Sequence, residues 1–480
     1  MTICPSSAGM NDSFLNDTIV APATVPGTGA ISILRVSGPE AFRFVDAVVQ
    51  LKRRTVSESD AYSIHFGSVS GLDDVLVSVF RAPHSYTGED SAEISCHASR
   101  FIVEEMLRRL VEAGCRMAGP GEFTRRAFLN GKMDLAQAEA VADVIASTSA
   151  AAHRVAFNQL RGGFSSELSA LRGELVEMTS LLELELDFSE EEVEFADRGR
   201  LVSLIDRTRS HVDRLAASFK DGNAIRNGVP VAIVGPANAG KSTLLNALVG
   251  EDRALVSEIA GTTRDTIEEI MNLDGLLFRF IDTAGIRETF ETVERMGIER
   301  TFRKISEAEI VIGVLDAASQ ECDLLNNLRM IVDRLDSSVQ KLIICLNKVD
   351  LVADSVVNKF VIAINELVSS AGLQPIIVKS AFKRSLGLPE LRSALVSLKS
   401  HLLAHGDSTF VTNERHYQAL LQTSSALADA RQALTSGIPS ELVSEDLRRA
   451  ISSLNQILGQ DLIDPETVLH SIFRNHCIGK

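Results

Sequence analysis

The sequence is poor in aromatic residues and has no paired cysteines. It contains no tryptophan and only 3 tyrosines among 480 residues. Proteins that hold single-stranded nucleic acid stack its bases on aromatic side chains, so this composition does not favour such a platform. The 6 cysteines are scattered and include no Cys-x-x-Cys pair, which predicts a reducing compartment and no zinc site.

Two further absences concern targeting and membranes. The first 30 residues contain no lysine or arginine, so we expect neither a secretory signal nor a mitochondrial presequence. No uninterrupted apolar stretch approaches the roughly 20 residues that a membrane-spanning helix needs. We therefore expect a cytoplasmic protein without a membrane-bound segment.

Basic residues are also in the minority. The chain has 64 acidic against 48 basic residues, a formal net charge of −16. This balance argues against a broad phosphate-binding surface, so any nucleic acid must meet a local basic patch or be held by a partner. With 45% apolar residues the chain is typical of a globular protein, and its length predicts about two to four domains.

Residues 17–118 have the pattern of a mixed α+β domain. Two segments of helical spacing, 39–50 and 99–114, lie between short runs rich in β-branched and apolar residues. These runs predict strands at 30–36, 75–80 and 91–97.

From about residue 123 the apolar residues recur every three or four positions, which predicts long amphipathic helices. The expected helices are 129–145, 155–186 and 201–219. From 229 onwards, short apolar runs alternate with helical segments, as in a doubly wound parallel sheet. The expected strands are 229–234, 277–281, 310–315, 341–346 and 375–378.

Helical periodicity returns from about residue 411, so the α/β domain is expected to interrupt a helical domain. The predicted organisation has four segments: an α+β domain, a first helical part, an α/β domain and a second helical part. Their boundaries are 1–118, 119–221, 222–404 and 405–480.

The segment Gly235–Ser242 reads Gly-x-x-x-x-Gly-Lys-Ser, and it follows an apolar strand and opens a helical run. Its glycines let backbone N–H groups converge on phosphate oxygens, and the helix N-terminus adds a favourable dipole. We expect Lys241 to meet the β- and γ-phosphates as a catalytic residue, and Ser242 to bind Mg²⁺. The nucleotide-binding residues predicted here are Asn238, Ala239, Gly240, Lys241, Ser242 and Thr243.

Three further motifs, each at the end of a predicted strand, indicate a guanine nucleotide. Asn347-Lys348-Val349-Asp350 supplies a carboxylate that accepts from guanine N1–H and the 2-amino group, which adenine does not offer. Ser380-Ala381 suits a backbone contact to the guanine oxygen. Asp282-Thr283-Ala284-Gly285 predicts a carboxylate near the metal and a glycine near the γ-phosphate. Because such sheets bind ligands at the carboxyl ends of strands, the motifs together predict a GTP-hydrolysing switch.

The segment Gly261-Thr262-Thr263-Arg264-Asp265 lies where a switch threonine closes on Mg²⁺ and the γ-phosphate, and we assign that contact to Thr263. Two residues after Gly285, where Ras-like proteins carry a water-orienting glutamine, this chain has Arg287. Hydrolysis must then position its water differently or be very slow. Arg287 is either a built-in arginine finger or an exposed switch residue.

These motifs and their flanking segments resemble the MnmE (TrmE) family of tRNA-modification GTPases over nearly the whole chain. The segments that carry the resemblance are Asp17–Pro22, Gly29–Gly38, Ser85–Asp90, Pro120–Ala140, Asn238–Ser242, Gly261–Asp265 and the terminal Cys477–Lys480. The resemblance implies a multidomain fold. An N-terminal α+β domain similar to tetrahydrofolate-binding domains precedes a discontinuous α-helical domain, into which a Ras-like α/β P-loop GTPase domain is inserted.

The resemblance also implies a potassium ion beside the phosphates. Its ligands match Asn238, Ser257, Ile259 and Thr262, and K⁺ there supplies positive charge where an arginine finger otherwise sits. Glu294 matches a carboxylate proposed to orient the hydrolytic water. From composition alone, Glu294 would be interpreted as a charge on a helix surface.

A folate site is implied in the first domain. Arg35, Glu93, Lys132 and Lys480 match positions that hold a tetrahydrofolate derivative, 5-formyl- or methylene-tetrahydrofolate. Basic groups suit a glutamyl tail, and a carboxylate accepts from the N–H and amino groups of a pterin. Without the family, Arg35 and Lys132 are surface charges. Cys477 is interpreted as a small buried thiol rather than a nucleophile, because no histidine is evidently paired with it.

The implied activity is GTP hydrolysis that drives a rearrangement of a tRNA-modifying complex. The complex adds an aminomethyl-type (carboxymethylaminomethyl) group to C5 of the wobble uridine of certain tRNAs, with a tetrahydrofolate one-carbon donor. The implied partners are a second copy of the chain in a homodimer, the FAD-containing protein MnmG (GidA) in a heterotetramer, and tRNA.

Two other classes are alternatives. A ribosome-assembly GTPase that binds rRNA would carry a basic module after the GTPase domain, whereas residues 405–480 hold six Lys or Arg against nine Asp or Glu. A membrane-remodelling GTPase would need a basic amphipathic face, which the acidic helices do not supply.

Overall fold

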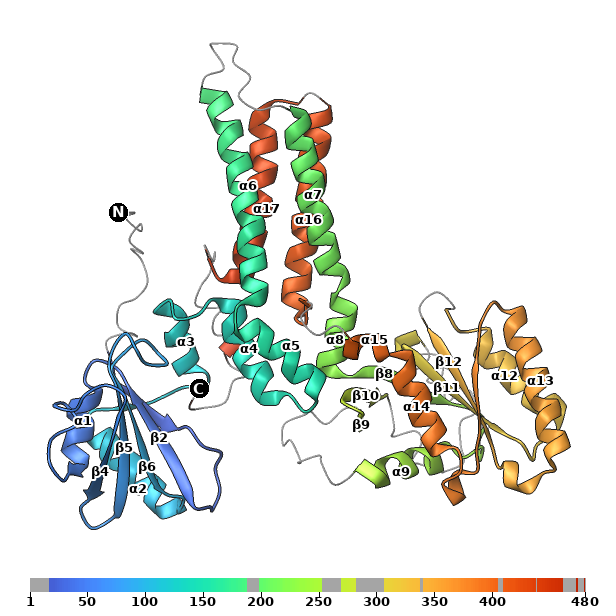
Figure 1. Ribbon diagram of the computed structural model, residues 1–480, viewed down its shortest axis with the longest axis horizontal. Coiled ribbons are helices and arrows are strands. Elements are labelled where there is room, and N and C mark those ends of the chain that lie inside the picture. The colour runs from blue at the N-terminus through green and yellow to red at the C-terminus, as the bar shows by residue number, and fades with distance from the viewer. Residues whose placement is uncertain are drawn as a thin grey trace. The chain divides into compact units, whose positions relative to one another are not determined.

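The computed structural model in Figure 1 describes most of the chain. The described residues are 17–187, 198–252, 269–281, 306–336, 340–404, 409–436, 438–460, 472–473 and 479. Contacts divide the chain into two compact units. The first contains residues 1–145, 159–210 and 422–480, and the second contains 146–158 and 211–421. The four domain boundaries predicted from the sequence stay predictions.

The first unit contains a seven-stranded sheet with the order β3-β4-β5-β6-β2-β1-β7. Only β1 and β7 pair in parallel among these strands. The strands are β1 (Ile19–Pro22), β2 (Ile31–Ser37), β3 (Gln50–Leu51), β4 (Ser63–Val69), β5 (Asp73–Phe80), β6 (Ser91–His97) and β7 (Arg116–Met117). The three predicted strands and both helical segments are confirmed, whereas the short strands β1, β3 and β7 and the strand β4 were not predicted.

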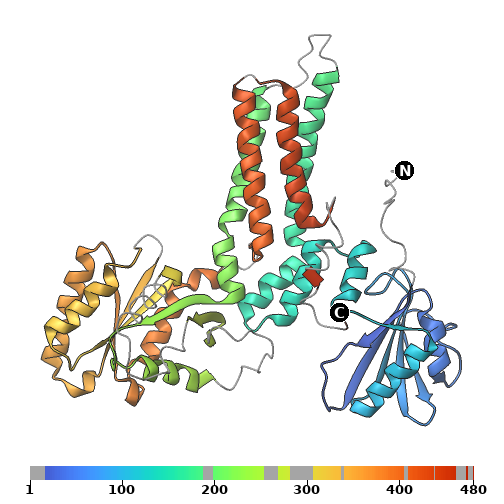
Figure 2. The same cartoon turned by 180° about the vertical axis from the view of Figure 1, so that it is seen from behind.

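Helices α1 (Ala41–Val48) and α2 (Arg100–Ala113) cover one face of this sheet. Figure 2 shows α2, in cyan, crossing in front of the blue strands. Strand β5 alternates: Val75, Val77 and Val79 are buried in the core with these helices, whereas Leu76 is 47% exposed. Arg35 and Glu93 lie opposite each other in the register of β2 and β6 and belong to the other face, against which Phe123 packs.

The helical part of the first unit is more interrupted than predicted. Helices α3 (Glu122–Leu129) and α4 (Leu135–Ala146) are separated by a turn in which Gly131 has φ +67°, so the predicted helix 129–145 starts too early. The predicted helix 155–186 is also wrong as one element. The chain breaks at Gly162, with φ +84°, between α5 (Ala150–Leu160) and α6 (Gly163–Asp187).

Long helices come from two separate stretches of the chain, one before and one after the second sheet (Figure 1). They are α6, α7 (Arg198–Ala217), α16 (Glu414–Thr435) and α17 (Ser440–Leu458). Helix α17 packs along α6, where Arg448 Nη2 lies 2.5 Å from Glu183 Oε1. Arg431 of α16 likewise lies 2.6 Å from Asp206 of α7, so segments far apart in sequence form one helical body. Residue 219, predicted to end the third helix, instead opens α8 (Phe219–Asn227).

The second unit contains a six-stranded sheet with the order β13-β12-β11-β8-β10-β9. All neighbouring strands are parallel except β10 and β9. The strands are β8 (Val229–Val234), β9 (Glu269–Leu273), β10 (Leu276–Phe280), β11 (Ile310–Asp316), β12 (Lys341–Asn347) and β13 (Ile376–Lys379). The five predicted strands are confirmed. Strand β9 was missed, although Asp274-Gly275 between two apolar runs is a hairpin signal.

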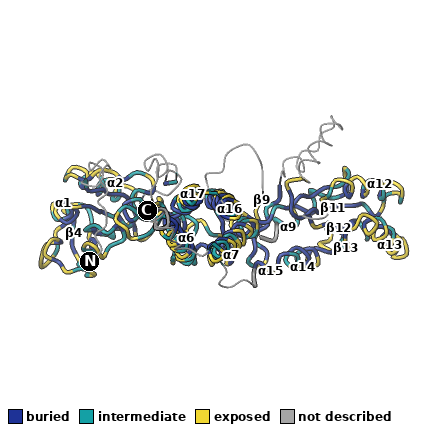
Figure 3. Tube along the Cα trace, turned by 90° about the horizontal axis from the view of Figure 1, so that it is seen from above, coloured by how far each residue is buried: buried dark blue, intermediate teal, exposed yellow. Residues whose placement is uncertain are grey.

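Helices cover both faces of this sheet. One core includes side chains of α9 (Lys241–Asp252) and α14 (Leu388–Leu398), and the other includes side chains of α12 (Glu321–Val332) and α13 (Asp354–Ser370). Alternate residues of β8 and β11 enter the two cores, as expected for strands buried on both sides. Figure 3 shows buried residues along β11 and β12 and exposed residues on the outer sides of α12 and α13.

Helix α15 (Ser400–Ala404) follows α14. In the described part of the chain, no helix combines the length and the apolar character needed to cross a bilayer.

Candidate functional site

The phosphate-loop candidate joins β8 to α9 and requires glycine at two positions. A Cβ on Gly235, which has φ +148°, would lie 2.2 Å from the Val314 carbonyl oxygen. A Cβ on Gly240, which has φ +108°, would lie 2.2 Å from Asn347 Nδ2. Between them, Asn238 adopts the left-handed conformation with φ +60°. The loop is therefore wrapped tightly against the ends of the neighbouring strands.

Lys241 begins α9 and its amine is held by the loop. Its Nζ donates to the carbonyl oxygens of Gly235 and Pro236, both at 2.8 Å. Buried Leu244 and Leu245 fix the helix on the sheet. Because a helix N-terminus and a lysine amine meet at this loop, the site is suited to bind an anion such as a phosphate.

Asn347, at the end of β12, ties the loop to the candidate base site. Its Nδ2 donates to the Ala239 carbonyl at 2.8 Å, and its Oδ1 accepts from the Phe382 N–H at 3.2 Å. The side chain is buried, at 4% residue exposure. The predicted segments 235–242, 347–350 and 380–381 thus meet at the carboxyl ends of β8, β12 and β13.

Two ion pairs line the candidate base site. Lys348 Nζ lies 2.5 Å from Asp316 Oδ2 at the end of β11, and Arg384 Nε lies 3.2 Å from Asp350 Oδ2. Neither Asp316 nor Arg384 was identified from the sequence, because both lie outside the short motifs. Asp316 had one available signal, since it follows a predicted strand of the same sheet.

The remaining predicted nucleotide and ion residues lie outside the described residues. They are Ser257, Ile259, Gly261, Thr262, Thr263, Asp282, Thr283, Ala284, Gly285 and Glu294, together with Arg287. In the described ranges, no group of three or more His, Cys, Asp or Glu side chains is arranged to hold a metal ion.

The candidate folate site in the first unit is built around Arg35. Its Nε donates to Glu93 Oε1 at 2.9 Å, and its Nη2 lies 2.8 Å from the same oxygen. The guanidinium carbon also lies 5.1 Å from the ring centroid of Tyr86 and 5.7 Å from that of Phe123. These rings fix the arginine by cation–π contact, and neither was identified from the sequence as a member of the site.

The C-terminal end of the chain reaches this site. Arg35 Nη1 lies 3.5 Å from the carbonyl oxygen of Gly479, the residue before Lys480. Lys480 and Cys477 lie outside the described residues. Lys132 is exposed and donates to the Pro83 carbonyl at 2.9 Å, so it contacts the same loop that carries Tyr86.

A buried arginine network lies in the same unit and was not predicted. Arg126 of α3 is 2% exposed and contacts the carboxylates of Asp17, Glu89 and Glu122. Burial by itself raises the pKa of Asp17, but hydrogen bonds and charge from Arg116 and Arg126 outweigh it and lower that pKa below 3.8. Burial also raises the pKa of Glu122, but hydrogen bonds from Arg116 and the Gly119 N–H, together with the charges of Arg116 and Arg126, lower it below 4.5.

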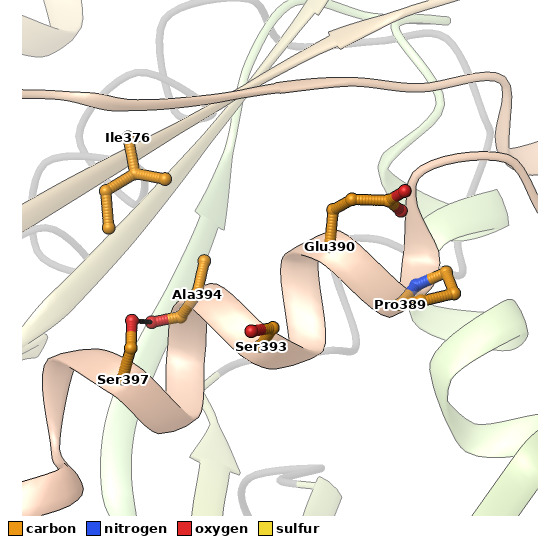
Figure 4. Close-up of a pocket in the computed structure, with 6 residues that line it drawn as sticks. All are labelled: Ile376, Pro389, Glu390, Ser393, Ala394 and Ser397. Carbon is orange, nitrogen blue, oxygen red and sulfur yellow. Dashed lines mark hydrogen bonds between the residues drawn. The ribbon is translucent and has the colours of Figure 1, made fainter.

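A shallow hollow on the second unit contains none of the predicted site residues. It is lined by Ile376 of β13 and by residues of α14, and Figure 4 shows these side chains. Ser397 Oγ donates to the Ala394 carbonyl at 2.9 Å, so this hydroxyl is bound to its own helix (Figure 4). The hollow is therefore no candidate for the nucleotide site.

Two family descriptions match the chain. Residues 18–132 match the N-terminus of the GTP-binding protein TrmE, and residues 135–477 match the MnmE helical domain. Among solved structures, the G domain of the T. maritima FeoB iron transporter aligns with 35% of this chain and 97% of its own. Its TM-score is 0.24 at 24% identity.

Curated relatives match over almost their full length. The tRNA modification GTPase MnmE of Bacteroides fragilis is 48% identical over 472 residues, which is 97% of this chain and 99% of the relative. The protein of that name from Parabacteroides distasonis is 46% identical, with 96% and 100% covered. The one from Porphyromonas gingivalis is 44% identical, with 98% and 99% covered. The chain belongs to the MnmE family of tRNA modification GTPases.

Proposed function

We propose that the chain is a K⁺-dependent GTP hydrolase that works with an FAD-containing partner on tRNA. The complex would install an aminomethyl-type (carboxymethylaminomethyl) group on C5 of the wobble uridine, using a one-carbon unit from tetrahydrofolate. The observation that carries the proposal is the meeting of segments 235–242, 347–350 and 380–381 in a chain of the MnmE family. The family name supplies the tRNA substrate class.

The phosphate loop supports nucleotide binding directly. Lys241 is anchored by two loop carbonyls, so its charge is already held in place before a nucleotide enters. Ser242, at the start of α9, supplies a hydroxyl of the kind that Mg²⁺ accepts in such loops. A bound Mg²⁺ supplies charge neutralisation at the β- and γ-phosphates.

Asn238 supports the potassium assignment. Its side chain is exposed, and its backbone is left-handed, with φ +60°, within the phosphate-loop candidate. An amide oxygen is a suitable ligand for an alkali cation, and Ser257, Ile259 and Thr262 would complete the set. A bound K⁺ supplies positive charge to the transferring phosphoryl group. Glu294 would orient the hydrolytic water.

The test is GTP turnover by the full chain in KCl and in NaCl at equal ionic strength. We expect turnover about 10²-fold higher in K⁺, comparable to the effect of one electrostatic contact to a transition state. Asn238→Ala should remove most of this difference while GTP still binds. Equal turnover in both salts would contradict potassium dependence and leave GTP binding untouched.

The face of the seven-stranded sheet that carries Arg35 supports a folate site. Arg35 and Glu93 present a cation and a carboxylate side by side, and Tyr86 and Phe123 add flat apolar rings. A carboxylate accepts from the N–H groups of a pterin, while Arg35, Lys132 and Lys480 suit a glutamyl tail. The folate derivative would supply the one-carbon unit.

Titration with 5-formyl-tetrahydrofolate tests this site. Arg35→Ala should weaken binding about tenfold or more, because the lost contact is charge-assisted. Arg43→Ala is the matched control, since Arg43 is 73% exposed on α1, where it contacts its sequence neighbours Glu40 and Phe44. Equal losses in both variants would contradict a specific folate role for Arg35.

The same face of the seven-stranded sheet supports a homodimer. Ile64, Phe66 and Leu76 are 67%, 43% and 47% exposed and are neighbours on β4 and β5. Adjacent exposed apolar side chains of this kind favour a protein interface. The proposed partners are a second copy of the chain on this domain and MnmG (GidA) in a heterotetramer. The proposed location is the cytoplasm.

A further inference from the structure

Asp350, the carboxylate expected to recognise guanine, has a cationic partner within the chain. Arg384 Nε lies 3.2 Å from Asp350 Oδ2. Asp350 belongs to the short helix η3 (Val349–Leu351), and Arg384 ends the short helix η4 (Phe382–Arg384). The two groups come from different loops, so their pairing depends on how these loops are held together.

Backbone hydrogen bonds hold both loops firmly. The Val349 N–H donates to the Ser380 carbonyl at 3.2 Å, which joins the two loops. The Ala381 N–H donates to the Leu386 carbonyl at 3.1 Å and closes the turn that carries Arg384. Phe382 anchors this turn in the core at 2% exposure. The arginine backbone is therefore fixed beside Asp350.

The two paired side chains differ in their access to solvent. The Arg384 side chain is 71% exposed, whereas that of Asp350 is 18% exposed. Arg384 has room in solvent to swing away without disturbing the fold. The Asp350 side chain, in contrast, is largely enclosed by its surroundings.

The guanidinium group resembles the guanine edge chemically. Guanine presents N1–H and the adjacent 2-amino group, which both belong to a planar N–C–N unit. Arginine presents paired N–H donors on the same kind of unit and suits carboxylates in the same geometry. Arg384 Nε lies against Asp350 Oδ2, one of the two oxygens that the guanine edge would use, so the guanidinium and guanine compete for that oxygen.

We propose that Arg384 competes with guanine for Asp350 and must leave this carboxylate before a guanine nucleotide binds fully. The proposal rests on the proposed function in one respect, the assignment of Asp350 to the base. Arg384 then lowers the affinity for GDP and GTP and slows their association. Because the pair is largely exposed on the arginine side, the effect is modest, about two- to fivefold in Kd.

The experiment measures binding of a fluorescent GDP analogue to the full chain by stopped flow. Arg384→Ala is compared with Lys383→Ala, which removes the same charge from the neighbouring exposed position of the same turn. In the described part of the chain, Lys383 pairs with no carboxylate. Loss of a positive charge near a phosphate site weakens nucleotide binding in both variants by general electrostatics. Competition strengthens binding in Arg384→Ala alone.

We expect Arg384→Ala to lower the Kd for GDP about two- to fivefold through faster association, and Arg384→Gln to behave alike. Unchanged or weaker binding in Arg384→Ala would overturn the proposal, while normal GDP binding by the unaltered chain would leave the guanine site standing. Asp350→Asn separates the two ideas. If it binds GDP as tightly as the unaltered chain, the guanine assignment itself fails. If Asp350→Asn loses GDP binding, this variant is next titrated with xanthosine diphosphate. Adding Arg384→Ala to Asp350→Asn should then not tighten the binding of xanthosine diphosphate.

Discussion

At the scale of single residues, one tight contact in the nucleotide site lies between Gly240 and Asn347. The Asn347 amide group occupies the place of a side chain at residue 240, so the phosphate loop and the base loop are joined where the glycine has no Cβ. The sequence motif requires glycine there for the phosphate, and the structure adds a second reason, the contact with the base loop.

Gly240→Ala tests this joint. A Cβ there would lie 2.2 Å from Asn347 Nδ2 and would add strain at φ +108°, so we expect GTP affinity to fall about tenfold or more. The matched control is Gly372→Ala, which has φ +74° and no atom within 4 Å of its Cβ. The control carries the strain without the clash, and fluorescence titration should show near-normal affinity. Equal losses in both variants would contradict the role of the joint.

At the scale of elements, helix α3 is attached to the sheet by a buried cation. Arg126 reaches Asp17 before β1 and Glu89 before β6, and its Nη1 donates to the Asp17 carbonyl at 2.8 Å. Tyr86 Oη also lies 2.8 Å from Thr124 Oγ1, so the ring beside Arg35 is tied to the same helix. Helix α3 thereby supports the candidate folate site.

Arg126→Met should destabilise this attachment by about 3 kcal/mol or more, because it removes the ion pair of the mostly buried Glu89 and leaves Arg116 as the remaining cation beside Asp17 and Glu122. Hydrogen–deuterium exchange over residues 122–129 measures the opening of the helix. Arg108→Met is the control, since Arg108 is 55% exposed and its surface pairs contribute below about 1 kcal/mol. Exchange that rises equally in both variants would contradict the network.

The same network predicts an acid-side loss of stability. The folded-state pKa values of Asp17 and Glu122 lie below 3.8 and 4.5, so their contribution is complete above those values and is lost as the pH falls through the lowered ones. Asp17→Asn removes one of the two groups, and its stability should therefore fall less steeply below about pH 4. Urea unfolding at pH 3 to 6 measures this. Parallel curves for the variant and the unaltered chain would count against it.

The elements themselves were predictable where one physical signal dominated. The five strands predicted for the second unit are apolar runs, and their carboxyl ends indicated where the nucleotide motifs would lie. The helix breaks at Gly131 and Gly162 were missed because one glycine only slightly weakens a helical pattern. Arg126 and Arg384 were missed as pairing residues because their partners lie on other elements, and a linear pattern does not report such contacts.

At the scale of the whole molecule, distant parts of the chain meet within each unit. Arg35 contacts Gly479, 444 positions away, and a Cβ on Gly479 would lie 2.0 Å from the Pro22 carbonyl oxygen. Without the family resemblance, nothing in the sequence would bring these ends together. The family membership, the joined nucleotide loops and the Arg35 site together support one account, in which GTP hydrolysis serves the modification of tRNA.

The most direct test of that account is nucleoside analysis of tRNA from cells that lack this protein. The account predicts loss of the carboxymethylaminomethyl-type modification at the wobble uridine. The unaltered chain should restore it, and Lys241→Ala, which removes the loop amine, should not. Wobble uridine modified to the normal level in the absence of the protein would contradict the account.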